Sequence, residues 1–152
     1  MSVESGNPQQ QQQEQKTAAT GELPVLFSMD WWRKVSEGYD ADPRTKKFHE
    51  NTTAIYSFKG TGLPDVMINI KDGVITVRPT QKGDSPEFHV GGPEEKWVRW
   101  HTGDYGILSG IVLKIFDFRG PLWRALRMGP FLLIWDEYSH KTEGIPPSKK
   151  KN

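Results

Sequence analysis

The chain has 152 residues, which is enough for one domain with a hydrophobic core and too few for two. It contains 20 Lys and Arg and 19 Asp and Glu, and the net charge of +1 gives no sign of the clustered positive charge that nucleic-acid binding needs. There is no cysteine, so disulfides, thiolate metal sites and cysteine nucleophiles are excluded.

No segment is typical of secretion or membrane insertion. Residues 1–22 lack the apolar core of a signal peptide. The most apolar stretch, Ile107–Trp135, is interrupted by charged residues, each of which costs roughly 2.5–3.5 kcal/mol at the centre of a bilayer. These residues are Lys114, Asp117, Arg119, Arg124 and Arg127. We therefore predict no integral membrane segment and a cytoplasmic location.

Both ends of the chain are polar. Residues 1–21 contain a run from Gln9 to Gln13, and residues 143–152 combine two prolines with terminal lysines. Neither segment carries enough apolar surface to offset the entropy lost on ordering. We expect a disordered Gln-rich tail at 1–21, a domain at 22–142 and a disordered basic tail at 143–152.

Two helices are predicted at the start of the domain. Trp31, Val35 and Tyr39 lie four residues apart and therefore share one helical face. A second helix is predicted over about 43–50, with Asp42 as its N-cap and proline in its first turn.

The hydrophobic period then changes to two, which is typical of strands. The alternating segments are 53–58, 66–71, 74–78 and 88–90. Asp72-Gly73 separates the second segment from the third and is a strong signal for a two-residue hairpin. A further turn is expected at Lys82-Gly83-Asp84. We predict a meander of three or four antiparallel strands with one buried face.

A helix is predicted from Pro93 to Gly103, because Trp97, Trp100 and His101 have helical spacing. The following segment, Ile111–Phe118, is rich in β-branched and aromatic residues. This composition predicts a fifth strand.

The last helix is predicted to begin at Pro121. Leu122, Ala125 and Leu126 share one of its faces. Two alternatives remain for Phe131–Trp135: the segment continues this helix beyond Gly129-Pro130, or it forms a separate apolar element after a kink.

The residue types that carry enzyme chemistry form no recognisable motif. None of the four histidines stands in an HExxH arrangement or has a carboxylate at metal-ligand spacing. There is no nucleophile elbow and no phosphate-binding loop. We predict no catalytic residue, no metal site and no cofactor. An enzyme acting on a hydrophobic substrate, with His89 or His101 as base, stays an alternative.

Large apolar side chains are unusually frequent in the C-terminal third, and six tryptophans occur in the chain. The tryptophans favour either an ordinary core or an aromatic-lined pocket. The excess in the last third favours a binding site. The candidate ligand-binding residues are Trp97, Trp100, Leu113, Ile115, Phe116, Phe118, Leu122, Trp123, Leu126, Phe131, Leu132 and Trp135.

Several short signatures follow one another along residues 25–135. They are Phe27-Ser28-Met29-Asp30-Trp31-Trp32, Asp40-Ala41-Asp42-Pro43, Lys71-Asp72-Gly73, Phe88-His89-Val90-Gly91-Gly92 and Leu108-Ser109-Gly110. With the order of the predicted elements, they resemble the sterol-carrier-protein-type (SCP2-like) lipid-binding domain in its small microbial form. The resemblance implies an α+β fold with a five-stranded antiparallel sheet covered by helices. It also implies an apolar tunnel between them for a fatty acyl chain, a sterol or a similar lipid, and no residue that carries out bond chemistry.

The chain departs from that family at the fifth strand and after it. The strand from Ile111 is more apolar than usual, Pro121 stands where the family has an acid, and the extension at 129–131 is unusual. These departures leave open whether the tunnel is open or is filled by the apolar C-terminal run.

We therefore predict a non-catalytic carrier that binds a lipid or another hydrophobic small molecule. The alternative is a protein-interaction or homodimerisation module, in which Trp123, Phe131 and Trp135 dock a protein partner or a second copy.

Overall fold

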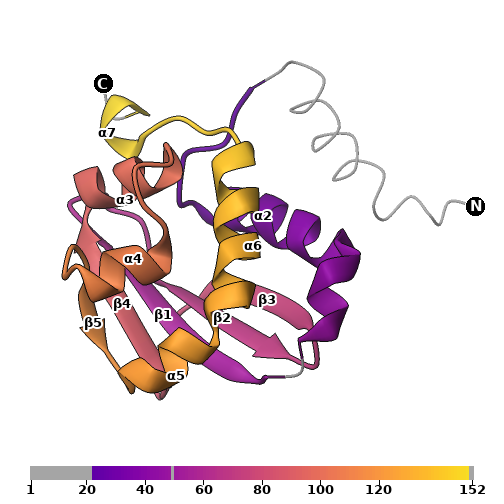
Figure 1. Cartoon of the computed structure of the whole chain (residues 1–152). Coiled ribbons are helices and arrows are strands. Elements are labelled where there is room, and N and C mark those ends of the chain that lie inside the picture. Colours follow the sequence, from indigo (N-terminus) through magenta and orange to yellow (C-terminus); the bar gives the residue numbers. More distant parts are fainter. Residues whose placement is uncertain (1–21, 49, 151–152) are drawn as a thin grey trace, which may run out of the picture.

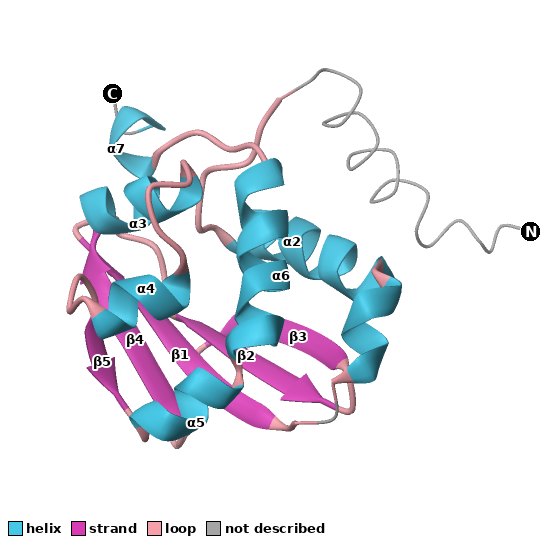
Figure 2. Cartoon of the chain, viewed as in Figure 1, coloured by secondary structure: helices cyan, strands magenta, loops and turns pink. Residues whose placement is uncertain are grey.

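The computed structural model of the chain describes residues 22–48 and 50–150. These residues form an α+β fold in which helices cover one face of a five-stranded sheet (Figures 1 and 2). The expected Gln-rich tail at 1–21 lies outside the described residues.

The helices and strands follow the order expected for an α+β domain. The helices are α2 (Met29–Ala41), the 3-10 helix η2 (Pro43–Lys47), α3 (Glu94–His101), α4 (Ile107–Val112), α5 (Leu122–Arg127), α6 (Gly129–Lys141) and α7 (Pro147–Lys150). The strands are β1 (Thr52–Lys59), β2 (Val66–Lys71), β3 (Val74–Pro79), β4 (Phe88–Pro93) and β5 (Asp117–Arg119).

The sheet has the strand order β3-β2-β1-β4-β5, and it is mixed. The prediction of a purely antiparallel sheet is wrong, because β1 and β4 pair in parallel, with Ala54 opposite Phe88. The turn at 82–84 does not close a hairpin. Residues 80–87 cross instead to the far side of β1, where the Glu87 amide donates to the carbonyl of Thr53. Strand β4 therefore starts at the same end of the sheet as β1.

The predicted fifth strand, Ile111–Phe118, is wrong over most of its length. Its first residues end helix α4, and only the short strand β5 pairs with β4. Lys114 adopts a left-handed conformation with φ 62°. The amide of Ile115 donates to the carbonyl of Gly110 at 2.8 Å, and the amide of Lys114 donates to Ile111 at 3.1 Å. This is a Schellman helix end. The sequence conceals it, because lysine occupies the position where glycine usually marks the end of a helix.

Replacing Lys114 with glycine is expected to stabilise the fold. A left-handed non-glycine residue costs roughly 1–2 kcal/mol, which glycine would avoid. Glycine also makes the unfolded chain more flexible, and this cancels roughly 0.4–1 kcal/mol of the gain in stability. We expect Lys114→Gly to raise the free energy of unfolding by about 0.5–1 kcal/mol in urea titrations. The matched control is Leu113→Gly, at a neighbour with φ −84°, which should lower it. A gain in stability from both substitutions would contradict the left-handed conformation assigned to Lys114.

The apolar segment Phe131–Trp135 forms an element separate from the preceding helix, as one of the two alternatives predicted. Helix α5 ends at Arg127, and Met128 precedes α6, which has Pro130 in its first turn. Phe131–Trp135 thus belong to a helix of their own, which lies across the sheet beside α2 (Figure 1).

Aromatic side chains fill the space between the helices and the sheet. Five of the six tryptophans are at most 1% exposed: Trp31, Trp32, Trp97, Trp100 and Trp135. The rings of Trp32 and Trp135 stack at 5.7 Å, and Phe27 stacks on Phe58 of β1 at 5.3 Å. Trp31, Trp32, Trp97 and Trp100 lie within this core, and Trp135 belongs to it while also bordering the cavity described below.

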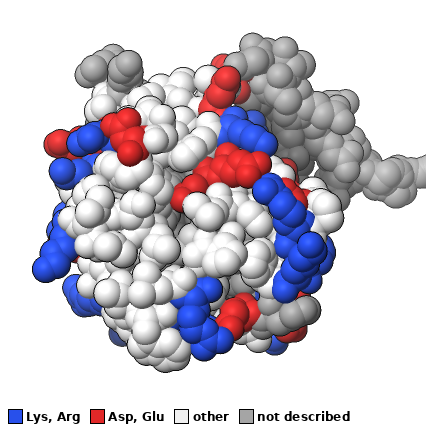
Figure 3. Space-filling model, viewed as in Figure 1, with Lys and Arg blue, Asp and Glu red and all other residues white. Residues whose placement is uncertain are grey.

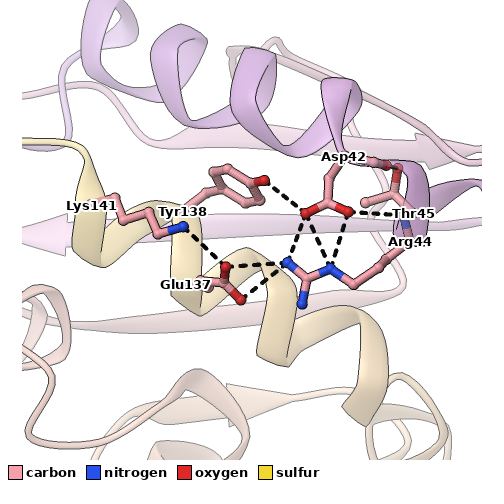
Figure 4. Close-up of polar contacts among 6 residues, drawn as sticks. All are labelled: Asp42, Arg44, Thr45, Glu137, Tyr138 and Lys141. Carbon is pink, nitrogen blue, oxygen red and sulfur yellow. Dashed lines mark hydrogen bonds and ion pairs between the residues drawn. The ribbon is translucent and has the colours of Figure 1, made fainter.

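A polar network fixes α6 against the end of α2 (Figure 4). The Asp42 carboxylate caps η2 by accepting from the Arg44 amide and also accepts from the Arg44 guanidinium at 2.7 Å. Tyr138 of α6 donates to the same carboxylate at 2.7 Å, and Arg44 reaches Glu137 at 3.1 Å. Arg44 and Tyr138 hold the pKa of Asp42 well below its usual range. The network therefore sets the position of α6 over the sheet.

The segment that we expected to begin a disordered basic tail pairs with the start of the domain. Ile145 forms a parallel bridge with Val25. The Leu26 amide donates to the carbonyl of Ile145 at 2.8 Å, and the Ile145 amide donates to Pro24 at 2.9 Å. Beyond residue 142, the described structure also includes α7, which ends at residue 150.

Candidate functional site

A small apolar cavity lies between the sheet and helices α4, α5 and α6. Its sheet side is formed by Thr52, Ala54, Tyr56, Ile68, Ile70 and Phe88. Its helical side is formed mainly by Ile107, Ile111, Ala125, Met128, Phe131 and Leu132. The strands supply alternate residues to this face, and the helices supply their inner faces, so the walls are almost wholly aliphatic and aromatic.

The cavity encloses about 40 Å³. That volume accommodates about three water molecules at most and is far below the volume of an acyl chain. The neighbouring aromatic core accounts for the rest of the space between the layers, because the rings of Trp97 and Phe116 lie 4.4 Å apart. The protein's own side chains thus fill most of this space.

The twelve predicted binding residues fall into several locations. Those that line the cavity are Phe118, Phe131, Leu132 and Trp135. Those buried in the adjoining core are Trp97, Trp100 and Phe116. Ile115 is half-buried and lies away from the cavity. Those exposed at the surface are Leu113, Leu122, Trp123 and Leu126.

Sequence reasoning missed the sheet side of the cavity, although a signal for it was present. Ala54 and Tyr56 of β1, and Ile68 and Ile70 of β2, alternate with outward residues and line the cavity. The period-two pattern therefore identified the right face of each strand. The inner face of α4, with Ile107, was hidden because the segment was interpreted as a strand.

A wider groove of about 640 Å³ opens on the surface between α4 and α6. Its walls include Leu108 of α4 and Leu133 of α6, and Asp136 lies at its base. Leu132 lines both this groove and the apolar cavity. The groove and the cavity therefore lie on two sides of Leu132.

Asp136 is a buried carboxylate, with 6% of its surface exposed. Its Oδ1 accepts a hydrogen bond from Trp100 Nε1 at 2.8 Å and one from the amide of Ile107 at 3.2 Å. Asp136 therefore joins α6 to α3 and to the first residue of α4. Burial raises the pKa of Asp136 to about 6, although the two hydrogen bonds oppose the shift.

An exposed apolar face covers the outer side of the same helices. Its residues are 46–70% exposed: Val112, Leu113, Leu122, Trp123, Leu126 and Leu133. Charged side chains lie mainly around the edge of this face (Figure 3). The guanidinium of Arg127 lies 5.7 Å from the ring centre of Trp123. This apolar face is the outer surface of the elements that cover the cavity.

The histidines proposed as alternative bases do not line the cavity or the groove. His101 contacts the carbonyl of Thr142 at 3.0 Å and packs on Trp31, and His89 lies on β4 between the inward residues Phe88 and Val90. Among residues 22–48 and 50–150, no three His, Asp or Glu side chains are grouped so that they could hold a metal ion. The same ranges contain no helix with the length and hydrophobicity needed to span a bilayer.

No protein-family model matches the sequence, and no curated protein matches it. Solved structures do match. A crystal structure of sterol carrier protein 2 aligns with a TM-score of 0.61 at 10% identity, over 78% of this chain and 99% of the other. A solution structure from Thermus thermophilus, described as possibly a sterol carrier protein, aligns with a TM-score of 0.58 at 11% identity, over 82% of this chain and 94% of the other. Together with the helices on one face of the sheet, these likenesses show that the chain has the fold of the sterol carrier protein 2 domains.

Proposed function

We propose that the chain is a non-catalytic carrier domain that binds a lipid or a similar apolar ligand between the sheet and helices α4 to α6. The observation that carries the proposal is the apolar cavity between these two layers, in a fold shared with sterol carrier protein 2. The one ionisable side chain on the cavity wall, Tyr56, has its pKa raised by burial and stays protonated at neutral pH. Such walls suit binding rather than acid–base chemistry.

Ligand entry requires the cavity to widen. Helix α5 is tied to the start of β1, because Arg124 pairs with Glu50 and Glu87 and donates to the carbonyl of Asn51. Helix α4 has no comparable ion pair among the described residues. One hydrogen bond, from the Ile107 amide to Asp136, holds the first residue of α4 to α6. We therefore propose that the site opens between α4 and α6, where Leu132 borders both the groove and the cavity. Each buried methylene gains roughly 0.8 kcal/mol, so a long acyl chain offsets the cost of separating the helices.

Native mass spectrometry of the purified full chain, before and after organic extraction, tests the proposal. We expect a bound mass that disappears on extraction and fragments as a lipid. Extracted protein should then take up a fluorescent acyl or sterol probe. A protein that carries no extractable mass and takes up neither probe would refute the proposal.

Two substitutions at the cavity should change probe affinity in opposite directions. Leu132→Ala removes three carbons between the cavity and the groove and is expected to tighten binding of a fluorescent acyl probe by about tenfold, since part of the reorganisation cost is removed. Ala125→Leu adds three carbons at a buried wall position and should weaken it by at least tenfold. Leu126→Ala, on the exposed side of α5, is the control and should leave the dissociation constant unchanged. Equal affinities in all three variants would place the ligand elsewhere.

The exposed apolar face favours a second candidate, self-association. The predicted interaction surface is partly wrong, because Phe131 and Trp135 are buried, and only Trp123 of that set is exposed. An apolar face on α4, α5 and α6 nevertheless resembles a contact surface. Sedimentation of the wild type and of Trp123→Ser with Leu133→Ser tests this candidate. A concentration-dependent dimer that the substitutions abolish would support it, and a monomer at all concentrations would refute it.

A further inference from the structure

Asp136 has one oxygen with a structural role and one without. Oδ1 accepts both hydrogen bonds, from Trp100 and from Ile107. Oδ2 has no hydrogen-bond partner within the described part of the chain, and the carboxylate borders the groove between α4 and α6. A side chain at position 106 would collide with Oδ2, so Gly106 leaves that oxygen uncovered. Oδ2 is not among the fully buried unpaired atoms, so it is open to the groove, where a hydrogen-bond donor or a cation can lie beside it.

The charges around the groove agree with this preference. Its walls carry two carboxylates, Asp136 and Glu137, together with His140, and they include no lysine or arginine. Glu137 is already paired with Arg44 at 3.1 Å and with Lys141 at 3.1 Å. Asp136 is therefore the carboxylate left to meet a ligand. An anionic headgroup in this groove would face uncompensated negative charge.

The walls beyond Asp136 suit an aliphatic chain. Leu108, Pro130 and Leu133 border the groove, and Leu132 connects it to the apolar cavity. Once the cavity widens, a molecule with a polar end at Asp136 can extend its apolar part past Leu132 and over the sheet. The widened site then combines one polar anchor with an apolar path, as amphiphile-binding pockets generally do.

We propose that this groove binds the headgroup of an amphiphile that carries a protonated amine, with Asp136 Oδ2 as its counter-ion and the hydrocarbon tail in the cavity. The inference rests on the proposed function, since it requires the tail site. It adds the headgroup class: an alkylammonium group rather than the carboxylate of a fatty acid.

Three twelve-carbon ligands test the proposal by titration calorimetry on the full chain, below their micelle concentrations. They are dodecylamine, dodecanol and dodecanoate. We expect the wild type to bind dodecylamine at least tenfold more tightly than dodecanoate, with dodecanol between them. Asp136→Asn keeps an oxygen for Trp100 and Ile107 but removes the charge, so it should weaken dodecylamine binding about tenfold and leave dodecanol unchanged. Glu37→Gln removes the charge of an exposed carboxylate of α2 outside the groove, so it is the control and should preserve the preference for the amine.

The outcomes separate this inference from the proposed function. If the wild type binds none of the three chains, the proposed function fails and the headgroup assignment fails with it. If it binds all three equally, or prefers dodecanoate, the carrier function stands and the headgroup assignment is overturned. Equal binding of amine and alcohol, both weakened by Asp136→Asn, overturns the requirement for a cation. The wild-type comparison decides the question even where a variant does not fold.

Discussion

Trp32→Ala is expected to lower the free energy of unfolding by about 3–5 kcal/mol, as removal of a fully buried large aromatic side chain generally does. Trp32 is 0% exposed, and its ring lies 4.7 Å from that of Trp31, 6.0 Å from Trp100 and 5.7 Å from Trp135. Its removal leaves a cavity that three helices border together. Domains of this size have about 5–15 kcal/mol of stability, so the loss removes a large share of it.

Two further tryptophan variants make the comparison decisive in urea titrations followed by circular dichroism. Trp123→Ala removes the same side chain from a position that is 61% exposed and should change stability by no more than about 0.5 kcal/mol. Trp32→Phe should cost less than Trp32→Ala, because Trp32 Nε1 has no hydrogen-bond partner among the described residues. Similar losses for Trp32→Ala and Trp123→Ala would contradict the layout of the aromatic core.

The sequence predicted elements where local patterns decide the structure. The four-residue spacing of Trp31, Val35 and Tyr39 gave helix α2, and all three residues are buried. The Asp72-Gly73 hairpin joins β2 to β3 as predicted, with both residues at positive φ. These patterns reflect interactions within a few residues, so neighbouring sequence contains the needed information.

Long-range pairing was not predictable in the same way. The parallel partnership of β1 and β4 depends on where residues 80–87 cross the molecule, and no local pattern specifies a crossing. The end of α4 depends on Lys114 accepting a left-handed conformation, which the tertiary structure imposes on a residue that seldom adopts it. The bridge between Val25 and Ile145 joins segments that each lack a strand pattern.

The candidate site follows the same division. Leu132, Trp135, Trp97 and Trp100 were all predicted as binding residues because they are large and apolar; the first two border the cavity, and the other two lie in the core beside it. Composition cannot distinguish a wall from a filled interior. Asp136 was not singled out at all, because a lone carboxylate in an apolar helix becomes informative only once Trp100 and Ile107 are seen to contact it.

The second large effect that we expect is a free energy of unfolding that depends on pH, because the carboxylate of Asp136 is buried. The pKa of this group is raised to about 6 in the folded protein from its ordinary 3.8, so between these values the folded state binds more protons than the unfolded state. Its contribution to stability is therefore complete below about pH 4 and declines as the pH rises to about 6. A shift of this size corresponds to about 3 kcal/mol at most.

The difference between wild type and Asp136→Asn isolates this effect. His89 and His101 have lowered pKa values because of burial, so they reduce stability as the pH falls, and the lowered pKa of Asp42 acts in the same direction at lower pH. These groups are common to both proteins and cancel. Relative to its value at pH 4, the stability advantage of Asp136→Asn should grow by up to about 3 kcal/mol by pH 7 and then remain constant. A difference that stays flat from pH 4 to pH 7 would mean that Asp136 titrates normally. If the Asp136 charge costs no stability in the ligand-free protein, a cationic headgroup gains nothing by neutralising it. This unfolding experiment therefore also tests the electrostatic reason for binding an amine in the groove.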